Sequence, residues 1–251
     1  MMTSSTRNKW ISAAAVIVIL AVWKIVSLYY NSNVILPSPE DTFLSLCKLV
    51  VDKNFLAVVG TTVLRGLIGF AIAGVLGVVI GIFAGLYSGF KAFINPFIVI
   101  IRSIPVIAVT LLALIWFVPN AVPVFIGLLT MFPMVCTNVI SGIESVNKNL
   151  VEMAKFYRVN KIKVICELYI PAIAPFIFSG LSNAFGIGWR AIIVGEVLSQ
   201  PKYGIGAMMQ MSQTYLKVDV LIAWTVVAVL LSYLFESIIR IIERKTIKWR
   251  S

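Results

Sequence analysis

Four ionisable residues stand inside or beside strongly apolar stretches of the sequence: Arg65, Arg102, Arg190 and Glu196. A charged side chain at the centre of a bilayer costs about 2.5–3.5 kcal/mol on insertion scales, so each should face protein or a water-filled path. For Arg102 and Arg190 two roles stay open: a structural ion pair, or a place along a path for an anionic solute. Arg190 and Glu196 are too far apart along one helix for a simple same-face pair. Arg65 is interpreted as snorkelling to the outer interface.

The sequence offers no catalytic constellation. It contains no histidine, so no Ser–His or Cys–His pair can form, and it has no GxxxxGK[ST] phosphate loop. Its three cysteines are scattered, which argues against a zinc, haem or disulfide site. Glu144 and Glu236 are expected near the cytoplasmic ends of their spans, where water would solvate them. We therefore expect no catalytic residue, no metal ligand and no cofactor bound by this chain.

The elements that must position these residues are membrane helices. Of the 251 residues 60% are hydrophobic and only 12% are charged, about half the charged fraction of a soluble domain. Several apolar runs reach the length of about 20 residues that a bilayer requires. We predict an all-α polytopic fold with six spans, at residues 10–30, 60–88, 93–117, 121–141, 170–198 and 219–241.

Most of the basic residues that give the net charge of +11 lie in connections and tails, which indicates membrane topology and not nucleic-acid binding. Two groups of basic residues fall on opposite sides of the predicted spans. The larger group comprises Arg7, Lys9, Lys91, Lys148, Lys155, Arg158, Lys161, Lys163, Arg240, Arg244, Lys245, Lys248 and Arg250, and the smaller comprises Lys48, Lys53, Lys202 and Lys217. By the positive-inside rule, both termini and the 142–169 loop face the cytoplasm. Lys24, in the first span, is expected to snorkel to the outer surface.

Small residues recur every four positions in two predicted spans, at Gly77, Gly81, Gly85 and Gly89 and again at Gly180, Ala184 and Gly188. This spacing places them on one helical face, where another backbone can approach closely. Ordinary helix packing explains such faces, and a sliding contact in a moving gate is the alternative.

The 142–169 loop is predicted to hold two short helices. Apolar residues from Lys148 to Tyr157 approximate a 3.6-residue period, Asn160 favours a turn, and a second helix should run from Lys161 to Leu168 before Pro171 opens the next span. The pair could anchor at the membrane interface or present a knob to a soluble partner. An earlier short helix is expected after the Pro-Ser-Pro-Glu-Asp sequence, with Ser38 or Asp41 as its N-cap.

This loop resembles the cytoplasmic EAA motif of binding-protein-dependent ABC importer permeases, E-A-A-x3-G-x9-I-x-L-P. Arg158 stands where the motif has glycine, and an L-residue in a left-handed turn costs on the order of 1 kcal/mol. Asn160 is the candidate to take over that turn. The residues in register with the motif are Glu152, Met153, Ala154, Arg158, Leu168, Ile170 and Pro171.

The resemblance extends over most of the chain and is to the nitrate/sulfonate/taurine branch of these permeases. Similar segments are ILPSP at 35–39, TTVLRGLIGFAIAGVLGVVIGIFAG at 61–85, RSIP at 102–105, and GWRAIIVGEVL at 188–198 followed by Gly204 and Gly206. Ser182 departs from the pattern, because relatives often have arginine there, so a substrate is not inferred from that position.

The resemblance implies a type I ABC importer permease fold, with an N-terminal helix and amphipathic segment in 1–59 and a permease core in 60–251. It implies a multi-pass subunit of a bacterial-type inner or plasma membrane, in contact with lipid, which pairs with a second permease copy, expected as a homodimer. ATPase subunits would bind ATP and Mg and dock on the loop. An extracytoplasmic solute-binding protein would deliver the solute, expected to be a small anion such as nitrate, a sulfonate or taurine, although a neutral pyrimidine-type vitamin precursor is also compatible with this branch. The implied ATPase-coupling residues are Glu152, Met153, Ala154, Tyr157, Arg158, Asn160, Leu168 and Pro171.

Two other classes of protein fit the sequence less well. A secondary transporter or channel would work without an ATPase, but the sequence shows neither an inverted repeat nor the midplane carboxylates that ion coupling requires. A membrane enzyme lacks catalytic groups. Arg102, Arg190 and Glu196 remain the candidates for a translocation path.

Overall fold

A computed structural model describes the backbone of residues 4–246 and the side chains of residue 11, 14–160 and 162–243. Among the basic residues used to predict the topology, Lys248 and Arg250 lie outside the described residues. The regular elements of the described chain are all helical: α1 (Ser4–Tyr30), α2 (Pro39–Val51), α3 (Phe55–Leu86), α4 (Ser88–Ser103), α5 (Val106–Trp116), α6 (Val122–Glu144), α7 (Lys148–Phe156), α8 (Lys161–Val164), the π-helical η1 (Ile165–Tyr169), α9 (Ile170–Ser199), α10 (Ile205–Thr214) and α11 (Val218–Thr246).

The all-α membrane fold is confirmed, whereas the count of six spans is not reproduced. Within the described residues four helical stretches are long and apolar enough to cross a bilayer: Phe55–Leu86, Val122–Glu144, Ile162–Ser199 and Val218–Glu243. A fifth candidate is the pair α4 and α5, which is bent by 97°, and the apolar part of α1 is the shorter Ala14–Tyr30.

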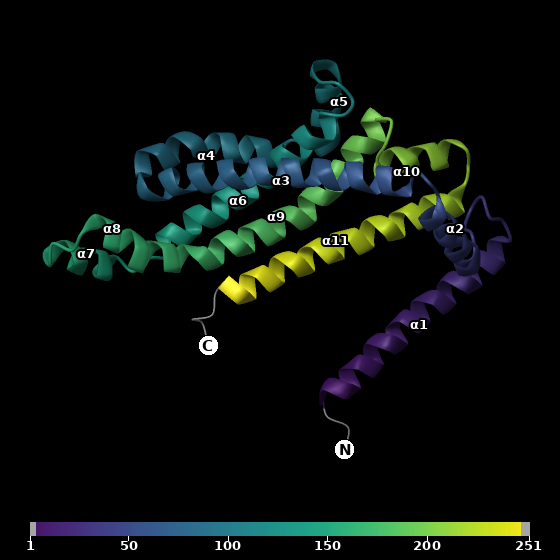
Figure 1. Ribbon diagram of the computed structural model, residues 1–251, viewed down its shortest axis with the longest axis horizontal. Coiled ribbons are helices and arrows are strands. Elements are labelled where there is room, and N and C mark those ends of the chain that lie inside the picture. Colours follow the sequence, from purple (N-terminus) through teal and green to yellow (C-terminus); the bar gives the residue numbers. More distant parts are fainter. Residues whose placement is uncertain (1–3, 247–251) are drawn as a thin grey trace.

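The span expected at 93–117 is therefore wrong as a single helix. It divides at Ile104 and Pro105, between the end of α4 and the start of α5. Proline has no N–H to donate, and it disfavours the helical conformation of the residue before it. Ile104 accordingly adopts an extended conformation, with φ −73° and ψ 129°. Helix α5 leaves the body of the molecule at this break (Figure 1).

The core of the protein forms where α3 and α9 pack on α6. A Cβ atom added to Gly77 or Gly81 of α3 would lie 2.7 Å from the Cβ of Val135 or Val139 of α6. The helix backbones therefore approach as closely as the valine side chains allow. The packing interpretation is confirmed for this glycine face, except at Gly89, which belongs to α4 and has open space around it.

The second small-residue face packs on the same central helix. A Cβ on Gly180 of α9 would lie 2.8 Å from the Cβ of Asn138, and one on Gly188 would overlap the side chain of Met131. Helix α6 is thus held between α3 and α9. The buried core here comprises Ala73, Met131, Val135, Val139, Ile143, Ile173, Ala184 and Ile192.

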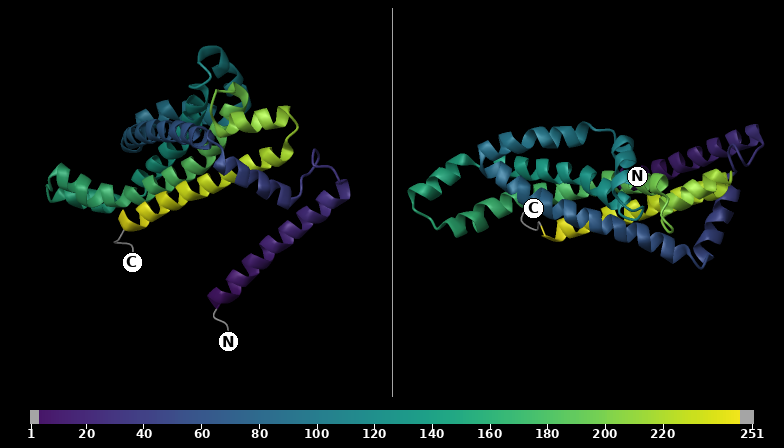
Figure 2. Two further views of the ribbon diagram at one scale, coloured as in Figure 1. Left: turned by 45° about the vertical axis from the view of Figure 1, so that its right-hand side comes forward. Right: turned by 90° about the horizontal axis from the view of Figure 1, so that it is seen from above.

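Helix α1 lies apart from this core and is joined to it through α2 (Figures 1 and 2). Trp23 Nε1 donates to the carbonyl of Pro37 at 3.0 Å, and Lys24 Nζ pairs with Glu40 at 2.8 Å. That hydrogen bond from Lys24 lowers the pKa of the Glu40 carboxyl below its usual value. Of the two candidate caps Ser38 is confirmed, because its side chain accepts from the amide of Asp41 at the start of α2.

Replacement of a packed glycine should destabilise the protein, whereas the same change at an open glycine should not. We expect Gly81→Leu to lower the free energy of unfolding by about 1–3 kcal/mol or more, because the new side chain overpacks against Val139. Gly89→Leu, the matched control, should stay within roughly 0.5 kcal/mol. Thermal unfolding of the two purified variants in detergent, followed by loss of the monodisperse species, tests this. Equal melting temperatures would contradict the packing described above.

Candidate functional site

Arg65 and Glu196 form a buried ion pair between α3 and α9. Arg65 Nη1 lies 2.5 Å from Glu196 Oε1, and the two side chains are 9% and 0% exposed. The expectation that Arg65 snorkels to the outer interface is therefore wrong. A carboxylate distant in the sequence reaches the guanidinium inside the protein, so the charge is compensated without leaving the helix bundle.

The polar atoms around this pair are hydrogen-bonded, as a buried charge requires. The bonds join α3 and α9 to the start of α10 and to the loop before α6, so four segments meet at one cluster. These bonds are Arg65 Nη1 to the Tyr203 carbonyl at 2.8 Å, Arg65 Nη2 to Asn120 Oδ1 at 2.8 Å, Thr62 Oγ1 to Glu196 at 3.0 Å, the Gly206 amide to Glu196 Oε2 at 2.9 Å and the Ile205 amide to Thr62 Oγ1 at 2.8 Å.

Two glycines after α9 let the chain turn back onto the ion pair. Gly204 has φ +153°, and a Cβ there would lie 2.7 Å from Glu196 Cδ and 2.8 Å from Arg65 Nη1. A Cβ on Gly206 would overlap the Ile193 carbonyl. The sequence analysis named both glycines only through the family resemblance, and it did not predict that they lie against the Arg65–Glu196 pair. A path role for Glu196 stays a prediction, and in this conformation its carboxylate is fully buried.

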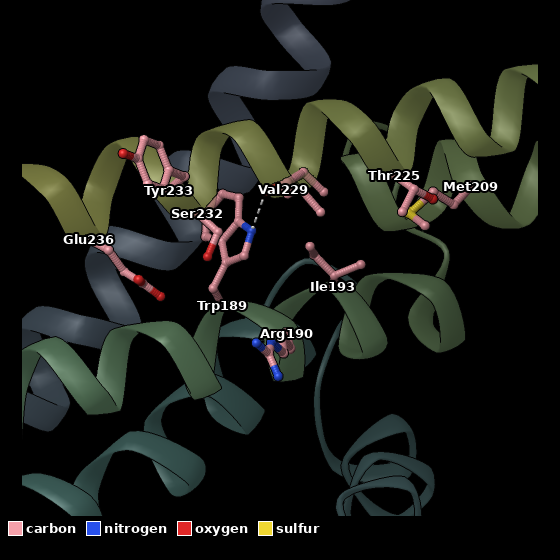
Figure 3. A pocket seen from close by; sticks show the side chains of 10 residues that line it. Trp189, Arg190, Ile193, Met209, Thr225, Val229, Ser232, Tyr233 and Glu236 are labelled. Carbon is pink, nitrogen blue, oxygen red and sulfur yellow. Dashed lines mark hydrogen bonds between the residues drawn. The ribbon is translucent and has the colours of Figure 1, made fainter. Parts of the chain in front are cut away.

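A cavity of about 370 Å³ lies between α9 and α11 (Figure 3). Arg190 and Glu236 both line it, but the structure gives them no ion pair with each other or with another described residue. Glu236 Oε1 lies 2.7 Å from the position of a Cβ on Gly186, in the middle of α9. The expectation that Glu236 lies near a cytoplasmic helix end is therefore wrong. Helix α11 begins beside α2, beyond the end of α9 (Figure 1). Because of this offset, a residue late in α11 such as Glu236 lies beside the middle of α9.

A second cavity, of about 440 Å³, lies at the break between α4 and α5 and extends to α6 and α9. Arg102 is its one ionisable lining residue, and among the described side chains none forms an ion pair with it. Ile187 of α9 also lines this cavity, one helical turn before Arg190. The three predicted path residues are thus in three different surroundings, and their path role remains a prediction.

The predicted cytoplasmic loop contains the two helices expected of it. Helix α7 (Lys148–Phe156) is capped by Asn147, whose side chain accepts from the Asn149 amide. α8 is the start of the second helix, which continues through η1 into α9 without a break. A cavity of about 320 Å³ lies between the two parts and is lined by Leu150, Met153, Tyr157, Val159 and Leu168, among others.

Arg158 adopts the left-handed conformation that the motif assigns to glycine, with φ +50°. The turn ends α7 by two hydrogen bonds, from the Arg158 amide to the Lys155 carbonyl at 3.0 Å and from the Val159 amide to the Ala154 carbonyl at 2.9 Å. This is the pattern of a helix C-terminus that favours glycine. The expectation that Asn160 takes over the turn is wrong, because its side chain instead accepts from the Ile162 amide and caps α8.

The loop ends in a π-helical segment, η1, directly before α9. The amide of Ile170 donates to the carbonyl of Ile165, five residues earlier. Pro171 then lies in the first turn of α9, as predicted, but α9 continues η1 without a break, so the missing N–H of Pro171 leaves a carbonyl of the preceding turn without its helical donor. A π-helical turn inside a longer helix is uncommon, and the sequence offered no signal for it.

Comparison with known proteins places this chain among transport proteins. The family described as "Binding-protein-dependent transport system inner membrane component" matches residues 77–248. The aliphatic sulfonates transport permease SsuC of Escherichia coli is 30% identical over 92% of this chain and 88% of its own length, and SsuC of Bacillus subtilis is 28% identical over 93% and 85%. The taurine transport permease TauC of Escherichia coli is 24% identical over 97% and 91%.

The solved structures of the MetNI methionine ABC transporter in inward-facing conformations show the same fold. One chain aligns with a TM-score of 0.56 at 15% identity, over 78% of this chain and 99% of its own. A second crystal form gives 0.55 at 16% identity, with the same coverage of both chains.

The stability losses from removing each partner of the buried pair should not add up when both partners are removed. Glu196→Gln leaves Arg65 charged and uncompensated, so we expect a loss of about 3–5 kcal/mol in the free energy of unfolding. The double variant Arg65→Met/Glu196→Met should lose less than the sum of Arg65→Met and Glu196→Met, because no buried charge remains. Chemical unfolding of the parent, the two single methionine variants and the double variant completes the cycle, and Glu196→Gln is measured beside them. Additive losses would show that the two side chains do not interact.

The positive φ of Arg158 predicts that glycine at this position stabilises the turn. Arg158→Gly should stabilise the turn by on the order of 1 kcal/mol, because glycine adopts a positive φ without steric cost. Arg158→Ala is the matched control, since it removes the guanidinium but retains the Cβ. Hydrogen exchange of the Val159 amide, which closes the turn, measures the effect. Slower exchange in both variants, or in neither, would contradict this account.

Proposed function

Since the chain belongs to the family of binding-protein-dependent transport system inner membrane components and is a permease subunit of an ABC importer, we propose that its α7–α8 loop couples transport to an ATPase. A permease of this kind is not itself an enzyme, and hydrolysis belongs to a separate subunit. ATP and Mg are therefore bound by the partner. The coupling residues are those of the motif: Glu152, Met153, Ala154, Tyr157, Arg158, Asn160, Leu168 and Pro171.

The exposed apolar surface of the loop carries this proposal. The side chains of Phe156 and Tyr157 are 82% and 71% exposed, and Ile162 in α8 is 69% exposed. The loop stands at the far end of the molecule from α2 and α10, beyond the packed lengths of α3, α6 and α9 (Figure 1). Large apolar side chains at such a protruding tip fit the groove of a soluble partner better than an anchor lying flat on the bilayer.

The rigid core would convert movement of the loop into movement of the spans. Helix α6 enters the loop and α9 leaves it, and both are held on one another through glycine contacts. Closure of the ATPase dimer on ATP would displace the loops of two permease copies, and α6 and α9 would follow as one body. The permease then requires only two accessible arrangements, because its partner supplies the switching energy.

The proposed solute is a small anion delivered by an extracytoplasmic binding protein. Arg102 and Arg190 bring positive charge to two cavities without an ion-pair partner among the described side chains. The relatives are named for aliphatic sulfonates and for taurine, and one of lower coverage for bicarbonate. With the basic loop and both termini in the cytoplasm, the Arg65–Glu196 cluster would lie toward the outer face, where the binding protein docks.

Charge reversal on α7 tests the coupling proposal. Glu152 is exposed, so Glu152→Lys should leave membrane insertion and folding unchanged, but reduce solute-dependent ATP hydrolysis about tenfold or more. The matched control is Lys48→Glu on α2, which is also exposed and lies at the other end of the molecule. Co-purification of the ATPase and hydrolysis in proteoliposomes are the measurements. Full activity in Glu152→Lys, or equal loss in both variants, would refute ATPase docking at α7.

A further inference from the structure

The π-helical turn η1 joins the α7–α8 loop to α9 within one continuous helix. Ile162–Ser199 is a single helical stretch of 38 residues, and inside it the amide of Ile170 donates to the carbonyl of Ile165, five residues earlier. A regular α-helix closes each turn on the carbonyl four residues earlier, so η1 holds one residue more than a regular turn. Such turns inside longer helices are rare, and they occur frequently at functional sites.

Two prolines weaken the helix directly beyond η1. Pro171 lies in the first turn of α9 and Pro175 in the second. Each lacks an N–H, so each removes one helical hydrogen bond. The stretch from η1 to Pro175 is therefore held by fewer backbone bonds than a regular helix of the same length. Prolines and π-helical turns are also the usual places at which a helix bends.

Packing changes from loose to tight at η1. No residue of α7 or of η1 is buried, whereas Ile173, in the early part of α9, belongs to the buried core. A Cβ on Gly142, near the end of α6, would lie 2.9 Å from the Cβ of Phe176, so α9 is seated on α6 soon after η1. The other connection of the loop is packed, because Val146, between α6 and α7, is buried. Of the two connections, η1 is therefore the loosely held one.

Free space adjoins this loosely held turn. The cavity of about 320 Å³ inside the loop is lined by Val164, Glu167 and Leu168 on the side of α8 and η1. Leu150 and Met153 of α7 line its other side. A change of angle at η1 would carry these side chains into space that is already present, so it requires no repacking of the core.

We propose that η1 is the hinge about which the α7–α8 loop turns relative to α9 during transport. Its additional residue lets the turn exchange hydrogen-bond partners without displacing α9 on α6. The loop stays seated on a rotating ATPase subunit, while its packed connection at Val146 transmits the displacement to α6, and α9 follows α6. This inference rests on the proposed function, because it concerns how the coupling loop moves.

Deletion of Cys166, an exposed residue of η1, tests the hinge in the permease–ATPase complex in nanodiscs. The deletion removes the additional residue and leaves a regular α-helix, with the register unchanged on both sides. Cys166→Ala is the matched control, because it removes the same side chain and keeps the π-turn. We expect both variants to retain the ATPase and the melting temperature of the parent. In the deletion variant alone, hydrogen exchange of the amides of 165–170 should slow by about tenfold or more, and ATP hydrolysis should fall by about tenfold or more.

A deletion in the packed part of α9 shows what the loss of a required residue does. Deletion of Ile187 turns the helix beyond it by about 100°, which moves Gly188 away from its contact with Met131. We expect this variant to have a lower melting temperature than the parent, in contrast to the deletion of Cys166.

Each other outcome overturns the inference. If deletion of Cys166 destabilises the complex as deletion of Ile187 does, η1 is a fixed part of the fold. If exchange at η1 is unchanged, the turn is not the flexible joint, and if exchange slows while hydrolysis is unchanged, coupling does not require bending there. An intact, hydrolysing complex with either result refutes the hinge alone, whereas failure of the ATPase to co-purify with the parent would refute the proposed function itself.

Discussion

Helix α6 touches α3 on one side and α9 on the other, at positions where a glycine leaves no room for a second side chain. In a bilayer, where lipid tails are as apolar as leucine, helices gain little from hydrophobic burial, so association depends on close van der Waals contact. Three helices packed in this way move together. Several other elements attach to them: α7 and α8 at one end, α10 at the other, α4 and α5 along the side, and α11 against α9 and α10.

The two ends of this core are built differently. At one end Arg65 and Glu196 bring α3, α9 and α10 together through hydrogen bonds that satisfy both charges. At the other end α6 and α9 are joined by a loop whose apolar side chains are exposed. One end therefore resists separation of the helices, whereas the other offers a surface to a partner. A force applied at the loop would be transmitted to a bundle that is already fastened at its opposite end.

Local sequence signals predicted the features that depend on neighbouring residues. The Ser38 cap and the packed face of Gly77 and Gly81 follow from neighbouring residues in one helix. The left-handed turn was instead expected at Asn160, because a positive φ is costly for an L-residue such as Arg158. The Arg65–Glu196 pair could not be predicted in this way, because its partners come from distant helices. Pro105 lies at the break between α4 and α5, but a proline in the sequence does not by itself distinguish a kinked helix from a break of 97°. The depth of Glu236 depends on the offset between α9 and α11, which hydropathy does not determine.

Three arginines lie in the apolar stretches of the sequence, and they differ in whether the protein compensates their charge. Arg65 is neutralised by Glu196 and also donates hydrogen bonds to the Tyr203 carbonyl and to Asn120, so its charge serves packing. Arg102 and Arg190 have no such partner among the described side chains, although each lines a cavity. An uncompensated charge at membrane depth is unfavourable in every conformation that does not give it water or a counter-ion. Glycine contacts and one satisfied ion pair account for the packing of the core without these two arginines, so a passing anion that compensates their charge belongs to the proposed function and not to the fold.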